Sequence, residues 1–280
     1  TKKGFLRVLL VREAKRTSER MVVLITSDGE FDGASFVEAV RAVYPAKSIQ
    51  RGIFRGFADV AAAEEVEVLY GPDTIDDCLC IRDGETMRQY YFRISPFSFF
   101  QTNTFGTERL YGLIRQWAKT IQPDILYDLY GGTGGIAFTC ADLAREIVSV
   151  ETVVSATQDG IFNAERNGVS NVQFLTDTVE HYLKDVRSYD SFPPGSAVVI
   201  DPPRPGLHPK ALQRLVRLCP ENLLCPRAGT PGAPRSLYDR RSARRGPLPA
   251  HRAHRGPGRI SPQGLGDRRE CAENLGQHAE

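Results

Sequence analysis

The chain has 280 residues, of which 41% are hydrophobic and 25% are charged, and its formal net charge is +2. This composition is typical of one or two globular domains, and it excludes a largely disordered or fibrous chain. The nearly neutral charge excludes a uniformly basic surface, so any nucleic-acid surface would have to come from local clusters of arginine.

The cysteines and the apolar runs narrow the class of protein further. The six cysteines make neither a CxxC pair nor a Cys/His set with zinc spacing, so we expect reduced thiols in a cytoplasmic protein, without a metal. No apolar run reaches the roughly 20 residues of a membrane helix, so we expect no membrane partner. The chain begins on Thr1, close to a strand-like run, which favours a fragment whose natural start lies upstream. We expect it to be a monomer.

Residues 1–95 alternate short β-like runs with one helical stretch. The β-like runs are RVLLVRE, MVVLITS, VEVLYG and YYFRIS, and the helical stretch is GASFVEAVRAVY. This mixture predicts a smaller α+β domain. No cluster of catalytic residue types stands out in this part of the sequence. We place the boundary of the domain near residues 93–98, without a long linker.

Residues 96–224 follow a different pattern, in which helices and strands alternate. A helical run after SPFSFFQTNT leads to the strand-like ILYDLY, EIVSVE, VQFLTD and AVVIDPP, with helical runs between them. Alternation of this kind predicts a parallel, doubly wound sheet, so the fold class is α/β with a Rossmann-like sheet.

The composition changes after Leu224. Residues 225–280 contain eleven Arg and no Lys, Val, Phe or Trp. Such a segment cannot build a hydrophobic core, and we expect it to be disordered. The change falls inside the strand-like run ENLL, and Arg, Pro, Gly and Ala are typical of GC-rich codons read in a wrong frame. We interpret residues 225–280 as a frameshifted tail, and the alternative is a genuine basic tail that binds RNA.

A glycine-rich turn follows the first strand of the α/β part. The strand ILYDLY runs into GGTGG, residues 131–135, directly before a helical run. Gly132 and Gly134 would let the backbone approach a nucleotide-type ligand at the helix N-terminus. Glu151, about twenty residues further on, is placed to accept hydrogen bonds from both ribose hydroxyls.

Two aspartates refine the class of ligand. Asp128 adds a carboxylate at the strand end, which suits the cationic methionine part of S-adenosyl-L-methionine better than a pyrophosphate. We therefore favour this cofactor over NAD, for which a full GxGxxG would be expected. Asp177 ends the next strand, in FLTD, where it either faces the adenine amino group or caps the following helix.

The run DPPRPGL ends the last clear strand, at the edge of the sheet where ligands bind in open α/β folds. Paired prolines fix φ and remove two backbone donors, so they can hold a loop rigid beside a reacting base. Asp201 would orient the substrate or the cofactor, and Arg204 offers two donors to a phosphate or a base edge of the substrate. The alternative is an ordinary turn.

These stretches together resemble the RNA uracil-5-methyltransferase family, which makes 5-methyluridine in transfer and ribosomal RNA. The matching stretches, in the order of the family, are SPFSFFQTNT, DLYGGTGGIA, VE at 150–151, NAERNG and DPPRPGL. The resemblance covers residues 4–224 and implies the class I methyltransferase fold. It also implies that Gln101, Tyr130, Glu151 and Asp201 contact S-adenosyl-L-methionine or its surroundings, and that the partner is rRNA or tRNA.

The departures from the family concern the chemistry. Uracil C5 is a poor nucleophile, so in the family a Cys thiolate adds to C6 and a Glu later removes the C5 proton. That Cys lies in SCNP, and the corresponding position falls near Arg227, where the motif is absent. Cys225 is the nearest thiol and our candidate nucleophile, whereas Cys219 lies before the strand-like run, where a buried or incidental thiol is favoured. No downstream Glu can be assigned. The family's Cys in DLYCG is Gly131 here. The family's N-terminal RNA-binding barrel and iron–sulfur cysteines have no match.

Three hypotheses follow from the sequence. The first is a fragment of an RNA uracil-5-methyltransferase with an intact cofactor half and impaired catalysis. The second is another S-adenosylmethionine enzyme that methylates an amino group of a base, although such enzymes usually place an aromatic residue where Arg204 stands. The third is a nonenzymatic RNA-binding module. Cofactor binding separates the third from the others, and analysis of the methylated base separates the first two.

Overall fold

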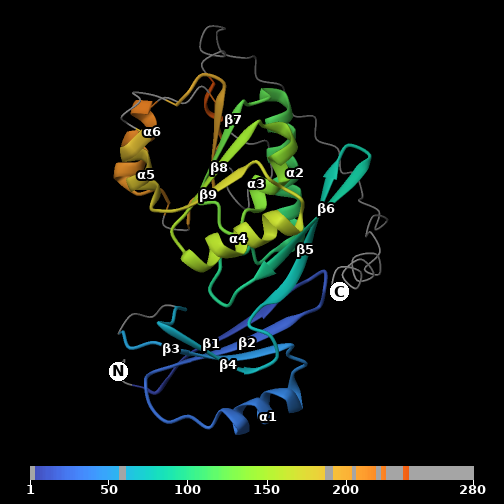
Figure 1. Ribbon diagram of the computed structural model, residues 1–280, viewed down its shortest axis with the longest axis vertical. Helices are drawn as coiled ribbons and strands as arrows, with labels where there is room; N and C mark the ends of the chain where they lie inside the picture. Colours follow the sequence, from blue (N-terminus) through green and yellow to red (C-terminus); the bar gives the residue numbers. More distant parts are fainter. Residues whose placement is uncertain are drawn as a thin grey trace, which may run out of the picture.

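The computed structural model describes residues 4–56, 61–186, 192–203, 206–218, 222–224 and 236–239 of the chain. Figure 1 shows a small sheet with one helix, a long β-hairpin, and a larger sheet flanked by helices. The predicted fold class, a smaller α+β part followed by a doubly wound α/β sheet, is confirmed. No helix in the described ranges is long and apolar enough to cross a membrane.

The small sheet has four strands in the order β1-β2-β3-β4. They are β1 (Leu6–Glu13), β2 (Arg20–Thr26), β3 (Ser48–Ile53) and β4 (Glu65–Tyr70), and α1 (Gly33–Val43) connects β2 to β3. Sequence analysis missed β3, because its sequence SIQRGI is polar. Its polar side chains are buried and paired: Gln50 donates to Ser48 Oγ at 2.8 Å, and Arg51 donates to Thr26 Oγ1 at 3.0 Å.

The hairpin joins the small sheet to the larger one. It consists of β5 (Ile75–Asp83), which the sequence analysis missed, and β6 (Thr86–Ile94). β5 packs against α2 (Thr104–Ile121) and β6 packs against α4 (Val154–Arg166). One hydrophobic core runs from Ile25 in β2 through Leu79 and Phe92 in the hairpin to Ile114 and Leu126. The division of the chain near residue 95 stays a prediction, and the core is continuous across it.

The larger sheet has the order β12-β11-β10-β7-β8-β9, with a parallel arrangement from β11 to β9. Its strands are β7 (Ile125–Leu129), β8 (Glu146–Glu151), β9 (Val172–Thr176), β10 (Ser196–Ile200), β11 (Asn222–Leu224) and β12 (Ser236–Asp239). The chain proceeds from β7 to β8 and β9, then returns to the other side of β7 as β10. Ligands of open α/β sheets bind at such a reversal, beyond the carboxyl ends of the strands.

Helices cover both faces of this sheet (Figure 1). They are α2, α3 (Gly135–Cys140) and α4 on one side and α5 (Val179–Val186) and α6 (Pro209–Leu218) on the other, with a short 3-10 helix at Ala141–Leu143. Successive strand residues point to opposite faces. Leu126 and Ile147 therefore pack in the core under α3, while Tyr127 and Val148 pack under α5 and α6.

Within the tail, residues 225–235 and 240–280 lie outside the described residues. Ser236–Asp239 forms β12, which pairs antiparallel with β11. We expected residues 225–280 to be disordered, and these four residues form a strand instead. Tyr238 has high β-propensity, and a strand beside β11 provides partners for the backbone of β11.

A row of polar side chains fastens α4 to β6, and it gives a role to the motif NAERNG. Asn167 accepts from Tyr91 N at 2.8 Å and donates to Tyr91 O at 2.7 Å. Asn163 makes the same pair of bonds to Arg93, at 2.7 and 3.2 Å. Four helical residues rise about 6 Å and two strand residues about 6.7 Å, so the two repeats nearly match. α4 thus binds β6 as a neighbouring strand would.

We predict that Asn167→Ala lowers the free energy of unfolding by about 1–3 kcal/mol, because it removes the partners of two polar backbone groups of β6. Thermal or denaturant unfolding of the full chain would measure this loss. Glu165→Ala, on the exposed side of the same helix, should change the stability by less than about 0.5 kcal/mol. Equal effects of the two substitutions would contradict the role of Asn167.

Candidate ligand-binding site

A pocket lies at the carboxyl ends of β7 and β10, where the strand order reverses. Three stretches supply most of its walls: the segment before α2, the glycine-rich turn after β7, and the residue after β10. The lining residues are Phe99, Phe100, Gln101, Tyr111, Tyr130, Gly131, Gly132, Thr133, Gly135, Ile136 and Asp201. The structure thus brings together the predicted residues Gln101, Tyr130, Gly132 and Asp201.

The glycine-rich turn follows β7 in a tight, irregular path. Tyr130 adopts the left-handed region with φ 71°, which costs a non-glycine residue about 1–2 kcal/mol. The N–H groups of Tyr130 and Gly131 both donate to Val150 O at 3.0 Å, which holds the turn against β8. Gly134 has φ 91°, and a side chain there would also meet the ring of Phe138 at 2.5 Å. The turn therefore leads directly into the N-terminus of α3, and the backbone of the turn faces the pocket.

The predicted ribose acceptor Glu151 lies beside this turn. Its Oε2 accepts from Gly132 N at 3.0 Å and its Oε1 accepts from Val153 N at 2.8 Å. Oε1 also accepts from Thr152 Oγ1 at 3.4 Å. A carboxylate offers about four acceptor positions, so one position, on Oε2, stays open for a ligand hydroxyl. The prediction that Gly132 and Glu151 belong to one site agrees with this contact, and their role toward a ligand stays a prediction.

Asp128 is fully buried beneath the glycine-rich turn, at the end of β7. No side chain of the described residues donates to its carboxylate, and the backbone N–H of Ala137 in α3 is the one described donor that acts on it. Burial, followed by the nearby charge of Asp201, raises the pKa of Asp128 to about 7; the N–H of Ala137 in α3 offsets this rise only in part. A buried carboxylate without a cation or a side-chain donor costs free energy, so its presence here indicates a missing partner that donates protons or carries positive charge.

Asp201 follows β10 and closes the pocket opposite the turn. It accepts from Gln101 Nε2 at 2.9 Å, a contact between residues 100 positions apart. Burial raises the pKa of Asp201, and the bond from Gln101 offsets part of that rise. Tyr111 of α2 lines the same pocket, and its pKa is raised by burial and by the charges of Asp201 and Asp128. None of the described residues that line the pocket is Lys or Arg.

Asp177 lies at the end of β9, next to β8 but not in the pocket lining. Its N–H donates to Glu151 O at 2.9 Å. Its carboxylate accepts from Thr178 N and contacts His181 Nδ1, each at 2.7 Å. The residue that caps α5 is Thr178, whose Oγ1 accepts from His181 N at 3.1 Å. The helix cap is therefore Thr178 rather than Asp177. Contact of Asp177 with an adenine stays a prediction.

The remaining predictions fall elsewhere. Arg204 and Cys225 lie outside the described residues. Sequence analysis did not single out Phe99, Phe100 or Tyr111 as pocket residues, because α2 carries Tyr111 at an ordinary core position. Their only sequence signal was their place in or near the motif SPFSFFQTNT. In the described ranges, no group of three or more His, Cys, Asp or Glu side chains could hold a metal ion.

We predict that Gly131→Ala destabilises the fold by about 1–3 kcal/mol, as overpacking of a core does. The added Cβ would lie well inside contact distance of Ser149 Oγ on β8. Ser149 Oγ is buried and has no hydrogen-bond partner among the described residues, so Ser149→Ala alone should be nearly neutral. When Gly131→Ala is combined with Ser149→Ala, the loss of stability should be smaller than in Gly131→Ala alone. A double-mutant cycle by denaturant unfolding measures this coupling, and strictly additive effects would contradict it.

Comparisons with known proteins assign the chain to a family. A family model described as tRNA (Uracil-5-)-methyltransferase matches residues 56–224, and this match ends where the composition changes. Proteins named as uncharacterized RNA methyltransferases of Caldanaerobacter subterraneus and Protochlamydia amoebophila are each 34% identical to it. These alignments cover 80% and 77% of this chain but 48% and 52% of those proteins.

A solved structure gives the same result. The tRNA (uracil-54, C5)-methyltransferase of Pyrococcus abyssi, in complex with S-adenosyl-L-homocysteine, is 26% identical with a TM-score of 0.56. The comparison covers 80% of this chain and 50% of that one, so the chain spans about half the length of the relatives it matches. Because the family model covers more than half of its residues, the chain belongs to the tRNA (uracil-5-)-methyltransferase family.

Proposed function

We propose that this chain binds S-adenosyl-L-methionine in the pocket between β7 and β10, and that its protein methylates C5 of uridine in rRNA or tRNA. Family membership supports the reaction class. The archaeal relative is described in complex with S-adenosyl-L-homocysteine, the product that S-adenosylmethionine leaves after methyl transfer. The residues of this chain support the proposal independently.

The observation that carries the proposal is the buried carboxylate of Asp128, to which no described side chain donates. Asp201 and Glu151 both lie close enough to Asp128 to raise its pKa. Asp128 is buried and Asp201 is half-buried, and the described pocket lining offers neither of them a cationic partner. Such a pocket attracts a cation and repels a pyrophosphate. S-adenosylmethionine carries an ammonium and a sulfonium, so its charge complements the acids. When bound, it supplies an electrophilic methyl group.

The other residues of the site would hold the remaining parts of the molecule. Glu151 would accept from the ribose hydroxyls while keeping its bond to Gly132 N. Tyr130 would lie along the nucleoside, and its left-handed backbone brings the turn close to the ligand. Gln101 and Asp201, already bonded to each other, would orient the reacting end. Asp177 would reach the adenine amino group, and Arg204 would contact the RNA.

Methyl transfer to C5 needs a further group. A thiolate that adds to C6 of uracil makes C5 nucleophilic, and a base then removes the C5 proton. The family match ends at residue 224, one residue before Cys225. We propose that residues 225–280 derive from a shifted reading frame, and that the nucleophile and the base are lost with the natural sequence. The chain would then bind its cofactor but turn over slowly.

We predict that the affinity for S-adenosyl-L-homocysteine, whose ammonium is also cationic, rises with pH through about pH 7 in the wild-type chain. The reason is that the ionised form of Asp128 binds the cation, while its pKa of about 7 keeps much of it protonated below neutral pH. The facing titratable groups are Asp201, Glu151, Cys140 and Tyr111. Calorimetry between about pH 5.5 and about pH 8.5 measures this dependence. In Asp128→Asn the dependence should largely disappear and the affinity should fall.

The stability of the ligand-free chain should change in the opposite direction. The Asp128 carboxyl has a pKa of about 3.8 in the unfolded chain and about 7 in the folded chain, so the folded state binds more protons between these pH values. Its contribution to stability is present below about pH 4 and is lost as pH rises toward 7. Asp128→Asn should remove this loss. An unchanged pH profile in the variant would show that Asp128 is not the titrating group.

We predict that the chain binds S-adenosyl-L-homocysteine, and that Glu151→Gln weakens binding by about 1.5–3 kcal/mol while keeping an acceptor for Gly132 N.

Methyl incorporation into unmodified rRNA and tRNA, followed by base analysis, tests the reaction. We expect little 5-methyluridine from this chain and more from a version with its reading frame restored after residue 224. Absence of binding would refute the cofactor site. An N-methylated base would indicate the amino-methyltransferase class, and comparable turnover from both versions would make Cys225 the next residue to substitute.

A further inference from the structure

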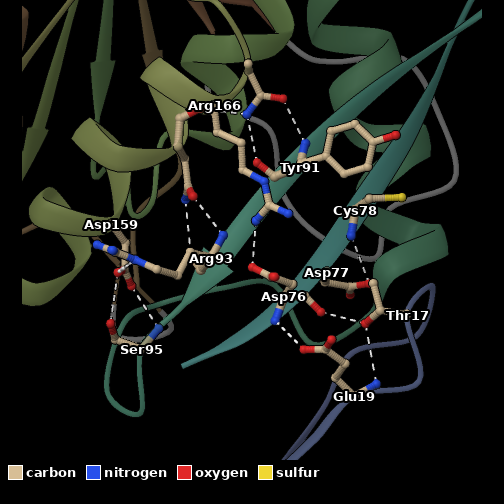
Figure 2. A network of polar contacts seen from close by, with 12 residues as sticks. Thr17, Glu19, Asp76, Asp77, Cys78, Tyr91, Arg93, Ser95, Asp159 and Arg166 are labelled. Carbon is tan, nitrogen blue, oxygen red and sulfur yellow. Dashed lines mark hydrogen bonds and ion pairs between the residues drawn. The ribbon is translucent and has the colours of Figure 1, made fainter. Parts of the chain in front are cut away.

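Asp159 is a buried carboxylate of α4 that lies outside the pocket lining. Its side chain is 1% exposed, and its two oxygens accept from four donors. Oδ1 accepts from Arg93 Nε at 3.1 Å and Ser95 Oγ at 2.8 Å. Oδ2 accepts from Ser95 N at 2.8 Å and Ser98 Oγ at 2.6 Å. Figure 2 shows Asp159 facing Arg93 and Ser95. All four acceptor positions are filled, so Asp159 has no capacity left for a ligand.

The residues that Asp159 holds begin a segment that ends in the pocket. We call residues 95–101 the pocket segment: it starts where β6 ends, and Phe99, Phe100 and Gln101 line the pocket. It has no regular secondary structure, and Gln101 at its far end donates to Asp201 at 2.9 Å. Because no helix or strand fixes the path of this segment, side-chain contacts at its beginning must fix it.

Arg12 of β1 holds the same segment from another side. Its Nη1 donates to Ser95 O at 2.8 Å and to Pro96 O at 2.7 Å. Asp159 thus receives the donors of residues 95–98, and Arg12 donates to their carbonyl groups. Opposite charges on the two sides of one irregular turn specify its position more strongly than neutral contacts, because hydrogen bonds to ionised groups are shorter and stronger.

We propose that Asp159 is a positioning residue, which places Phe99, Phe100 and Gln101 of the pocket segment for ligand binding. The proposal rests on the proposed cofactor site for its ligand. It differs from the role of Asn163 in α4 and Asn167 at its C-cap, since those side chains bind β6 and the helix itself but not the pocket segment. Asp159 acts on the pocket through residues 95–98, at a distance from the ligand.

The expected loss of affinity depends on how often the pocket segment occupies the position that allows binding. If the segment without Asp159 holds its pocket-lining position about a tenth of the time, the apparent affinity falls about tenfold. We therefore expect Asp159→Ala to weaken binding of S-adenosyl-L-homocysteine about tenfold, and Ser98→Ala, which removes one of the four donors, to weaken it about threefold. Asn167→Ala is the matched control. It should lower the melting temperature but leave the affinity within about twofold.

A second measurement needs no ligand. Phe97, Phe99 and Phe100 give the pocket segment three cleavage sites for chymotrypsin. Digestion of the full chains well below their melting temperatures, with the cut positions identified by mass spectrometry, reports local opening of the segment. We expect faster cleavage at these sites in Asp159→Ala and Ser98→Ala, and a wild-type rate in Asn167→Ala.

The outcomes separate this proposal from the proposed function. If Asn167→Ala loses as much affinity or is cut as fast as Asp159→Ala, then Asp159 only stabilises the fold and the proposal is wrong. If Asp159→Ala does not fold, Ser98→Ala decides: wild-type cleavage and affinity in that variant overturn the proposal. If the wild-type chain does not bind S-adenosyl-L-homocysteine, the proposed cofactor site fails, and the cleavage rates still decide whether Asp159 positions the segment.

Discussion

The backbone of β6 needs hydrogen-bond partners on the side that faces away from β5, and α4 provides them with side chains. Asn167 and Asn163 bind alternate residues of the strand, and Asp159 continues the row to Ser95. Arg166 of the same helix also donates to Asp76 of β5 at 2.6 Å (Figure 2). Buried backbone groups must be paired, so this row determines where the hairpin lies on the larger sheet. The path of the chain into the pocket depends on it.

The pocket combines a strained turn with an excess of negative charge. The left-handed conformation of Tyr130 costs stability, and Asp128 is buried with no side-chain donor among the described residues. Both features reduce the stability of the ligand-free chain, and such features cluster at functional sites. By contrast, Arg115 is equally buried but binds Asp83 at 2.9 Å and Asp142 at 2.5 Å. The protein therefore satisfies its buried charges where they are structural and leaves them open in the pocket.

Much of the site was predictable because its chemistry lies in short, consecutive stretches. GGTGG after a strand, Glu151 at the end of the next one and Asp201 at the end of a third all occupy carboxyl ends of parallel strands, which share one edge of a sheet. The strand β3 was not predictable from its amino-acid sequence, because Gln50 and Arg51 are buried only where partners from elsewhere in the chain bind them. The hairpin's attachment to α4 was hidden for the same reason.

By itself, the sequence determined the alternation of strands and helices in residues 96–224, the glycine-rich turn and the change of composition after Leu224, since each depends on neighbouring residues alone. Only the tertiary structure decided what each acid does. Asp128, Asp159 and Asp177 have the same side chain, yet no described side chain donates to the first, the second is saturated and the third is paired with His181. The physical reason is that burial and available donors are set by segments far apart in the sequence, which local patterns do not encode.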